Sequence, residues 1–224
     1  MSVGISCGVV SMSRVPPGSA SPHGPGRPFP DEWNVDLPNQ VEVAERIARH
    51  RGLNREHADR LGLLSQGRAA TAWAEERFKR ETCAAQVPTT EQEQHTGQGM
   101  WRLVDRDEGL RDTSMEAPAG LQPVMPTAVH TAGNSSQVSG GAAAILWASK
   151  RMARALKLKL RARIVAHALV GANPHVHLDA PVDATYAVLG GAGRTLRDID
   201  LAEINEAFAS VVLSWAQKPS AFRT

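Results

Sequence analysis

The chain has 224 residues and a net charge of +2, with 25 Lys and Arg residues against 23 Asp and Glu residues. This balance argues against a protein that binds nucleic acid through bulk positive charge, and the 42% hydrophobic content argues against general disorder. The two cysteines, Cys7 and Cys83, are too few for a disulfide framework or a four-cysteine zinc site.

The sequence shows no pattern typical of a secretory signal or a membrane span. Its first residues lack a basic region, and no apolar window reaches the roughly 18 residues that cross a bilayer. We therefore expect a cytoplasmic protein with reduced cysteines that does not bind membranes.

The first part of the chain predicts one strand and then helices. Residues 2–12 predict a short buried strand, because apolar residues alternate with small ones. The proline-rich stretch 14–40 predicts a loop. Residues 40–50 predict a helix, in which Val43 and Ile47 lie one turn apart.

Further helices are predicted before the middle of the chain. Asn54 is a suitable N-cap for a second helix, and a third is predicted over about 63–80. Residues 82–126 are polar and irregular in pattern. Residues 128–147 combine a loop of small residues with an apolar run, and 148–158 predict a basic helix.

The last part of the chain predicts alternating strands and helices. Residues 163–170 predict a buried strand, 182–192 a helix, 198–204 a strand and 205–217 an amphipathic helix. Asn205 could serve as the N-cap of that last helix. This alternation is typical of α/β layering.

Histidines and an aspartate alternate in the HVHLD run, at His175, His177 and Asp179. This run partly matches the HxHxDH signature of metallo-β-lactamase-type hydrolases, in which such side chains converge on zinc. Ala180 stands where that signature has its last histidine, which favours a polar loop. A metal-dependent hydrolase is kept as an alternative.

Two other features have simple structural interpretations. Gly190, Gly191 and Gly193 follow a helical pattern, which favours a helix end over a phosphate-binding loop. A run of basic residues without acidic ones favours a solvated surface over a nucleic-acid or acidic-ligand site. It contains Lys150, Arg151, Arg154, Lys157, Lys159, Arg161 and Arg163.

Three stretches match the motifs of one enzyme family in order and spacing. They are CGVVSMSR at 7–14, HTAGNSSQVSGGAAA at 130–144 and DIDLAEINEAFAS at 198–210. They resemble the GG(V/I)ESMSR, TAGN(A/S)S…DGAAA and NEAF motifs of thiolases, which are acyl-CoA acetyl- and acyltransferases. The resemblance covers about residues 4–217 and is closest to actinobacterial thiolases, including those that shorten steroid side chains.

The resemblance implies an incomplete thiolase-like α/β fold with αβαβα layers. Residues 1–158 would form the C-terminal part of the thiolase N-terminal domain, including a loop domain at about 13–130. Residues 159–224 would begin the thiolase C-terminal domain.

The resemblance also implies roles for site residues. Asn205 corresponds to the asparagine that orients a water in an oxyanion hole, and Ser136 to a residue beside the pantetheine arm of CoA. His177 corresponds to a residue that lines the acyl pocket, and Phe208 is implied to bind substrate. Coenzyme A enters as a substrate, and no cofactor or metal is implied.

The resemblance places the family's nucleophilic cysteine before Cys7, and its histidine and second cysteine after the NEAF motif, and these 224 residues contain no match to any of the three. Neither Cys7 nor Cys83 matches a catalytic position. We therefore expect a thiolase-family acyltransferase of fatty-acid β-oxidation or steroid degradation, present as an internal fragment that is inactive alone. An alternative is a non-catalytic subunit that binds CoA or a thiolase partner. The resemblance favours a homo-oligomer or pairing with a full-length thiolase.

Overall fold

The structure is a computed structural model that describes residues 2–12, 14–19, 32, 34–36, 38–89, 100–112, 114, 118 and 120–218. The chain divides into two compact units. Unit 1 consists of residues 1–51 and 136–224, and unit 2 consists of residues 52–135. None of the described helices is both long enough and apolar enough to cross a bilayer.

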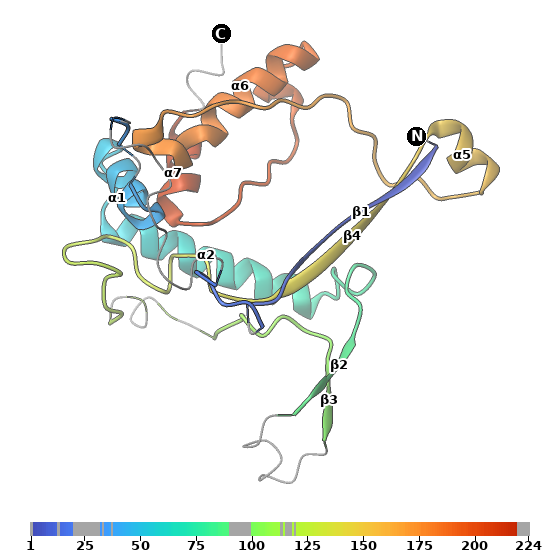
Figure 1. Ribbon diagram of the computed structural model, residues 1–224, viewed down its shortest axis with the longest axis horizontal. Helices are drawn as coiled ribbons and strands as arrows, with labels where there is room; N and C mark the ends of the chain where they lie inside the picture. The colour runs from blue at the N-terminus through green and yellow to red at the C-terminus, as the bar shows by residue number, and fades with distance from the viewer. Residues whose placement is uncertain are drawn as a thin grey trace. The chain divides into compact units, whose positions relative to one another are not determined.

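Unit 1 contains a two-stranded antiparallel ribbon (Figure 1). Strand β1 (Val3–Val10) pairs with β4 (Gly141–Ala148), and Ile5 lies opposite Leu146. The strand predicted at 2–12 is therefore confirmed, but the prediction that it is buried is wrong, because Ile5 is 69% exposed. A short helix, α5 (Lys150–Ala155), follows β4 and is capped by the Ser149 side chain.

The core of unit 1 lies among helices. Helix α1 (Gln40–His50) contacts the 3-10 helix η1 (Pro174–Asp179) and α7 (Ala209–Gln217). Apolar side chains of α1 and α7 are buried, among them Ala44, Val211 and, just before α7, Phe208.

Local capping explains the limits of these helices. The helix predicted at 40–50 is confirmed, and Asn39 and Glu42 form a capping box at its start. Helix α6 (Ala180–Ala192) begins two residues before its predicted start and ends at Gly193 in the left-handed conformation, with φ 60°. The helix end predicted in this glycine-rich stretch is thus confirmed, at Gly193.

Two strands predicted in unit 1 do not form. Residues 163–170 are irregular and none of them is buried, with Leu169 98% exposed. Residues 198–204 contain only the end of the 3-10 helix η2 (Leu196–Asp198), followed by irregular chain in which Leu201 is 92% exposed. A strand needs a neighbouring strand to pair its backbone groups, and neither segment has one among the described residues.

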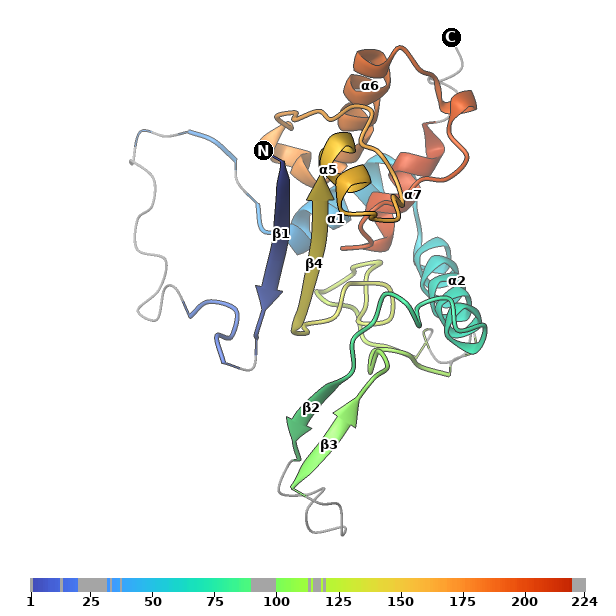
Figure 2. The same ribbon diagram turned by 90° about the vertical axis from the view of Figure 1, so that its right-hand side faces the viewer.

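Unit 2 contains helix α2 (Arg55–Ala74) and a hairpin of two strands, β2 (Ala85–Pro88) and β3 (Trp101–Val104). The two strands are antiparallel and lie side by side (Figure 2). Asn54 caps α2 as predicted, since its side chain accepts from the His57 amide. The prediction of separate second and third helices is wrong, because α2 is continuous. The hairpin also corrects the prediction that 82–126 is wholly irregular.

Gly62 of α2 lies against the loop that carries the TAGN motif. A Cβ atom at this position would overlap the carbonyl oxygen of Gly133. The buried side chain of Asn134 donates to Asp59 Oδ1 at 2.7 Å, and Asp59 also accepts from Arg55. Helix α2 therefore fixes the backbone of the TAGN loop within unit 2.

Candidate functional site

The backbone joins two of the motif segments in unit 1. The amide of Ser136 donates to the carbonyl oxygen of Ala207 at 2.9 Å. Ser136 belongs to the GNSS loop, and Ala207 lies in the NEAF segment between Asn205 and Phe208. Two candidate site residues, Ser136 and Asn205, thus lie on directly contacting stretches of chain.

The NEAF segment is anchored by one residue and exposed at another. Phe208 is 8% exposed and packs in the core cluster with Ala44 and Val211. Asn205 is exposed in irregular chain before α7, which begins only at Ala209. The prediction that the last helix begins at Asn205 is wrong, so its side chain is not used as an N-cap. Phe208 positions the segment, and its predicted substrate contact stays a prediction.

His177 lies half-buried in η1. Its Nδ1 is 3.1 Å from the carbonyl oxygen of Pro174, so Nδ1 donates to that oxygen. The implied role of His177 in an acyl pocket stays a prediction.

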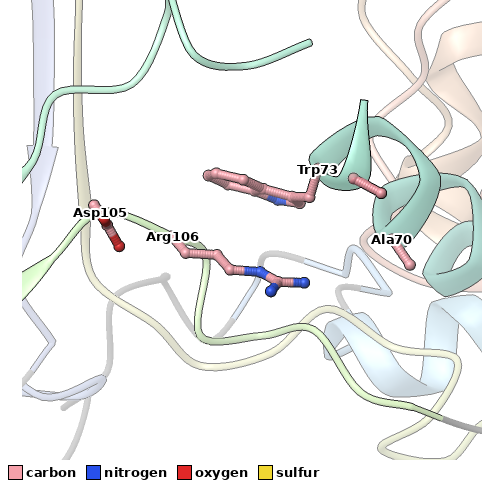
Figure 3. Close-up of a pocket in the computed structure, with 5 residues that line it drawn as sticks. Ala70, Trp73, Asp105 and Arg106 are labelled. Carbon is pink, nitrogen blue, oxygen red and sulfur yellow. The ribbon is translucent and has the colours of Figure 1, made fainter. Parts of the chain in front are cut away.

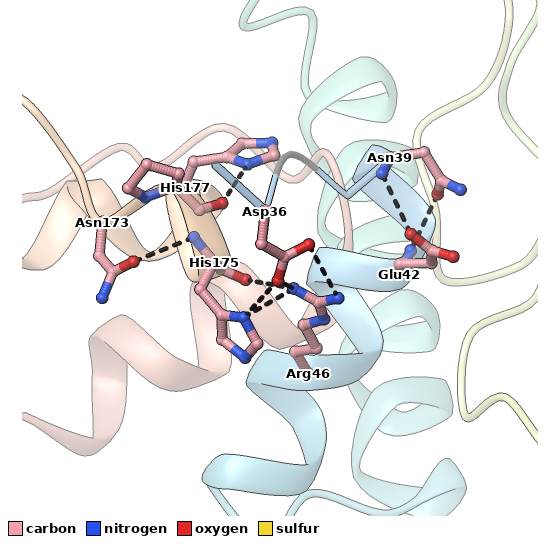
Figure 4. Close-up of polar contacts among 8 residues, drawn as sticks. Asp36, Asn39, Glu42, Arg46, Asn173, His175 and His177 are labelled. Atoms are coloured by element: carbon pink, nitrogen blue, oxygen red, sulfur yellow. Dashed lines mark hydrogen bonds and ion pairs between the residues drawn. The ribbon is translucent and has the colours of Figure 1, made fainter. Parts of the chain in front are cut away.

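The neighbouring His175 joins a different cluster (Figure 4). Its Nδ1 lies 2.7 Å from Asp36 Oδ2, and the Arg46 guanidinium donates to the same carboxylate oxygen at 2.6 Å. The hydrogen bond from Arg46, and secondly that from His175, holds the pKa of Asp36 below its ordinary value. This cluster ties the chain before α1 to η1.

The third member of the HVHLD run has partners of its own. Asp179 accepts from Arg51 Nη2 at 2.6 Å, and the Ser214 hydroxyl donates to its other oxygen. The three side chains of the run are thus committed to separate partners. No group of three or more His, Cys, Asp or Glu side chains in the described part of the chain could hold a metal ion. The metal-hydrolase alternative is therefore not supported.

The two cysteines are free thiols and both are exposed. Cys7 lies in β1 opposite Ala144, and Cys83 lies in the chain before β2. Cys7 belongs to unit 1 and Cys83 to unit 2.

Unit 2 contains a cavity of about 310 Å³ that sequence reasoning did not identify. It is lined by Ala70, Trp73 and Ala74 of α2 and by Asp105 and Arg106 after β3. Figure 3 shows the Arg106 guanidinium beside the Trp73 ring, 5.9 Å from its centroid, which is cation–π geometry. The lining contains none of the candidate site residues.

Sequence reasoning also missed the partners of Arg46 and Arg51. Each arginine contacts side chains more than a hundred positions away, namely His175 for Arg46 and Asp179 for Arg51. No periodic or local signal marks contacts of that separation.

Comparison with known proteins identifies both halves of the sequence. Residues 1–151 match the family model for the thiolase N-terminal domain, and residues 158–221 match that for the thiolase C-terminal domain. The predicted domain boundaries at 158 and at 13–130 stay predictions.

Curated relatives match most of this chain. The 3-ketoacyl-CoA thiolase of Vibrio cholerae serotype O1 is 40% identical over 178 residues, which cover 78% of this chain and 44% of that protein. The steroid 3-ketoacyl-CoA thiolase of Mycobacterium tuberculosis is 35% identical over 221 residues, which cover 94% of this chain and 51% of that protein. The chain therefore spans about half the length of the curated relatives it matches.

Solved structures agree with these matches. The human mitochondrial 3-ketoacyl-CoA thiolase superposes with a TM-score of 0.80 and 28% identity, over 98% of this chain and 57% of that one. The predicted thiolase-like fold, incomplete relative to these proteins, is confirmed. The chain belongs to the thiolase family.

Proposed function

We propose that this chain provides the CoA-binding loop and one oxyanion-hole asparagine of a thiolase-type acyltransferase site. The observation that carries the proposal is the hydrogen bond from the Ser136 amide to the Ala207 carbonyl. It holds the loop proposed to contact the pantetheine arm against the segment that presents Asn205. A thioester bound along Ser136 would then lie close to the Asn205 carboxamide.

The chemistry of Asn205 suits this role. A carboxamide donates and accepts hydrogen bonds without changing charge with pH, so it can hold a water in one orientation. That water would donate to the negative charge that develops on the thioester oxygen. One such donor accelerates acyl transfer by about 10²–10³-fold. Because Asn205 is exposed, water and substrate can reach it.

Thiolysis also needs a thiolate that attacks the 3-oxo carbon of the substrate. The bond between carbons 2 and 3 then breaks, the acyl group stays on the sulfur, and acetyl-CoA is released after carbon 2 takes up a proton. Neither Cys7 nor Cys83 corresponds to that nucleophile, and a donor for the oxyanion has no charge to stabilise without it. We propose that the 224-residue chain binds CoA thioesters but does not turn them over.

Two measurements test this proposal. Isothermal titration with CoA is expected to give saturable heat, and Ser136→Trp should weaken the affinity about tenfold or more by filling the pantetheine position, a loss of about 1.4 kcal/mol. Ser139→Trp, an exposed site in the same loop, is the matched control. Absence of CoA binding by the folded chain would overturn the binding proposal.

Turnover is followed as loss of acetoacetyl-CoA in the presence of CoA. We expect no rate above the reagent blank. A rate above the blank that disappears in Asn205→Ala would show that the chain is active alone and would overturn the proposed lack of turnover.

The finer assignments rest on the relatives. The identity to the steroid 3-ketoacyl-CoA thiolase over 94% of this chain supports a place among thiolases of steroid or fatty-acid degradation. We also propose a cytoplasmic location and association with a second copy or with a full-length thiolase. The role in steroid or fatty-acid degradation is tested by measuring whether expression of this chain rises when cells grow on steroids or fatty acids as the carbon source.

A further inference from the structure

The cavity of unit 2 has one wall on a single face of α2. Ala70 lies one turn before Trp73 and Ala74, so the three side chains share a face of the helix. The two alanines leave space, because each carries only a methyl group, and the half-buried ring of Trp73 stands beside them. This wall of the cavity is therefore apolar.

The loop after β3 forms the second wall and is fixed to the same helix. The side chain of Gln66 on α2 accepts a hydrogen bond from the Arg111 amide at 2.9 Å. Within the loop, the Asp107 carboxylate accepts from the Gly109 amide at 2.7 Å. These contacts hold the loop beside α2, so the cavity is bounded by two segments that are tied to each other.

Two opposite charges from this loop lie in the lining, and Figure 3 shows their side chains pointing in different directions. Among the residues that the structure describes, neither Asp105 nor Arg106 has an ion pair or a side-chain hydrogen bond. Nearby Arg102, in contrast, pairs with Glu108 at 2.8 Å. The contact of Arg106 with the Trp73 ring brings no counter-ion, so its guanidinium can still bind a carboxylate.

The two charges restrict the ligand that suits the cavity. Arg106 would attract a simple carboxylate but Asp105 would repel it, and the reverse holds for a simple ammonium ion. A ligand that carries both charges can pair with both residues. The apolar wall of α2 suits a hydrocarbon group, and a volume of about 310 Å³ is at the small end of ligand pockets.

We propose that this cavity binds a small zwitterion, namely an α-amino acid with an aliphatic side chain. Its carboxylate accepts hydrogen bonds from Arg106, its ammonium group donates to Asp105, and its hydrocarbon chain lies against Trp73 and Ala70. The site lies within unit 2 and contains neither Ser136 nor Asn205. The inference is therefore independent of the proposed function, and its test contains no CoA.

The probe is L-leucine, titrated into the folded chain up to about 50 mM, because so small a ligand binds in the millimolar range. The NMR signal of the Trp73 indole N–H, assigned with Trp73→Phe, should shift and saturate. Isocaproate lacks the ammonium group of leucine, and isoamylamine lacks its carboxylate. Both should bind about fivefold more weakly than leucine, because each loses one ion pair.

This series decides the proposal on the unchanged chain. A signal that does not shift saturably with leucine overturns the binding site. Equal affinity of leucine and either analogue overturns the pairing of both charges, and with it the assignment of a zwitterion.

Variants locate the site. Asp105→Asn and Arg106→Gln each remove one charge and should weaken leucine binding about fivefold. Arg77→Gln is the matched control, since Arg77 is exposed, pairs with Glu75 and lies outside the lining. Circular dichroism verifies that each variant retains the helix content of the parent chain. Parent-level binding by both cavity variants, or equal weakening in Arg77→Gln, would show that leucine binds elsewhere.

Discussion

At the scale of single residues, Arg51 connects three elements of unit 1. It follows α1, its Nε donates to Ser214 Oγ of α7 at 2.8 Å, and its Nη2 donates to Asp179 of η1. The Arg51 and Asp179 side chains are only 14% and 18% exposed. Removing one partner of a poorly solvated ion pair leaves the other charge uncompensated.

We therefore expect Arg51→Ala to lower the free energy of unfolding of unit 1 by about 2 kcal/mol or more. Amide hydrogen exchange in α1 and α7 measures the change. Arg194→Ala is the control, because the ion pair of Arg194 with Asp198 spans 4.0 Å and is exposed. Its loss should change the free energy of unfolding measured by exchange by less than about 0.5 kcal/mol. Equal effects of the two variants would contradict the assigned role.

Asp36 predicts a pH dependence with a defined sign. The hydrogen bond from Arg46, and then that from His175, lowers the folded-state pKa of Asp36 below its ordinary value of 3.8. Such a carboxylate stabilises the fold above the unfolded-state pKa, and this contribution is lost as the pH falls through the folded-state value.

Asp36→Asn should therefore be less stable than the parent at neutral pH, and the difference should shrink below pH 3.8. Urea midpoints of both proteins across this range measure the effect. A difference that is constant with pH would contradict the ionic role of Asp36.

At the scale of elements, two glycines of α2 have opposite surroundings. A Cβ on Gly62 would overlap the Gly133 carbonyl oxygen, whereas nothing lies within 4 Å of a Cβ on Gly67. We expect Gly62→Ala to destabilise unit 2 by about 1–3 kcal/mol through overpacking, and Gly67→Ala to stabilise it by about 0.5–1 kcal/mol through helix propensity. Thermal unfolding followed by circular dichroism compares the pair, and the same sign for both substitutions would refute the close approach.

Elements whose ends are encoded locally could be predicted from the sequence. Asn39 and Asn54 start α1 and α2, and Gly193 ends α6, each through contacts within a few residues. The predicted break within α2 was wrong because no proline or cap interrupts the hydrogen-bond ladder between Arg55 and Ala74.

The strands at 163–170 and 198–204 could not be judged locally. Their β-type composition is real, but a strand exists only with a neighbour, and the described residues supply none. The site had the same limit. The motifs indicated Ser136 and Asn205, while the contact between their segments depends on backbone groups that no side-chain pattern encodes.

At the scale of the whole molecule, the burial of apolar side chains differs greatly between parts of the chain. Val43 and Ile47 of α1 are 0% and 1% exposed, whereas Leu160 and Ile164 in the extended segment after α5 are 59% and 62% exposed. Segments with few buried contacts open at low free-energy cost. We expect trypsin to cut after Lys159 at least about tenfold faster than after Arg49 of α1.

Mass spectrometry of early digestion products checks this order of cleavage. Arg163→Gln, which removes a neighbouring site without touching the helices, serves to assign the fragments. Cleavage at Arg49 as early as at Lys159 would show that the helical core of unit 1 opens as readily as the extended segment.

The contact between Ser136 and Ala207 joins main-chain atoms only. It therefore tolerates the replacement of either side chain, with proline at 136 as the exception because that residue has no amide hydrogen. Mutational drift can then rewrite the side chains around the proposed thioester site while the two stretches of chain stay in contact. Evolution can in this way alter what a thiolase accepts, or silence it, long before the arrangement that holds its ligand is lost.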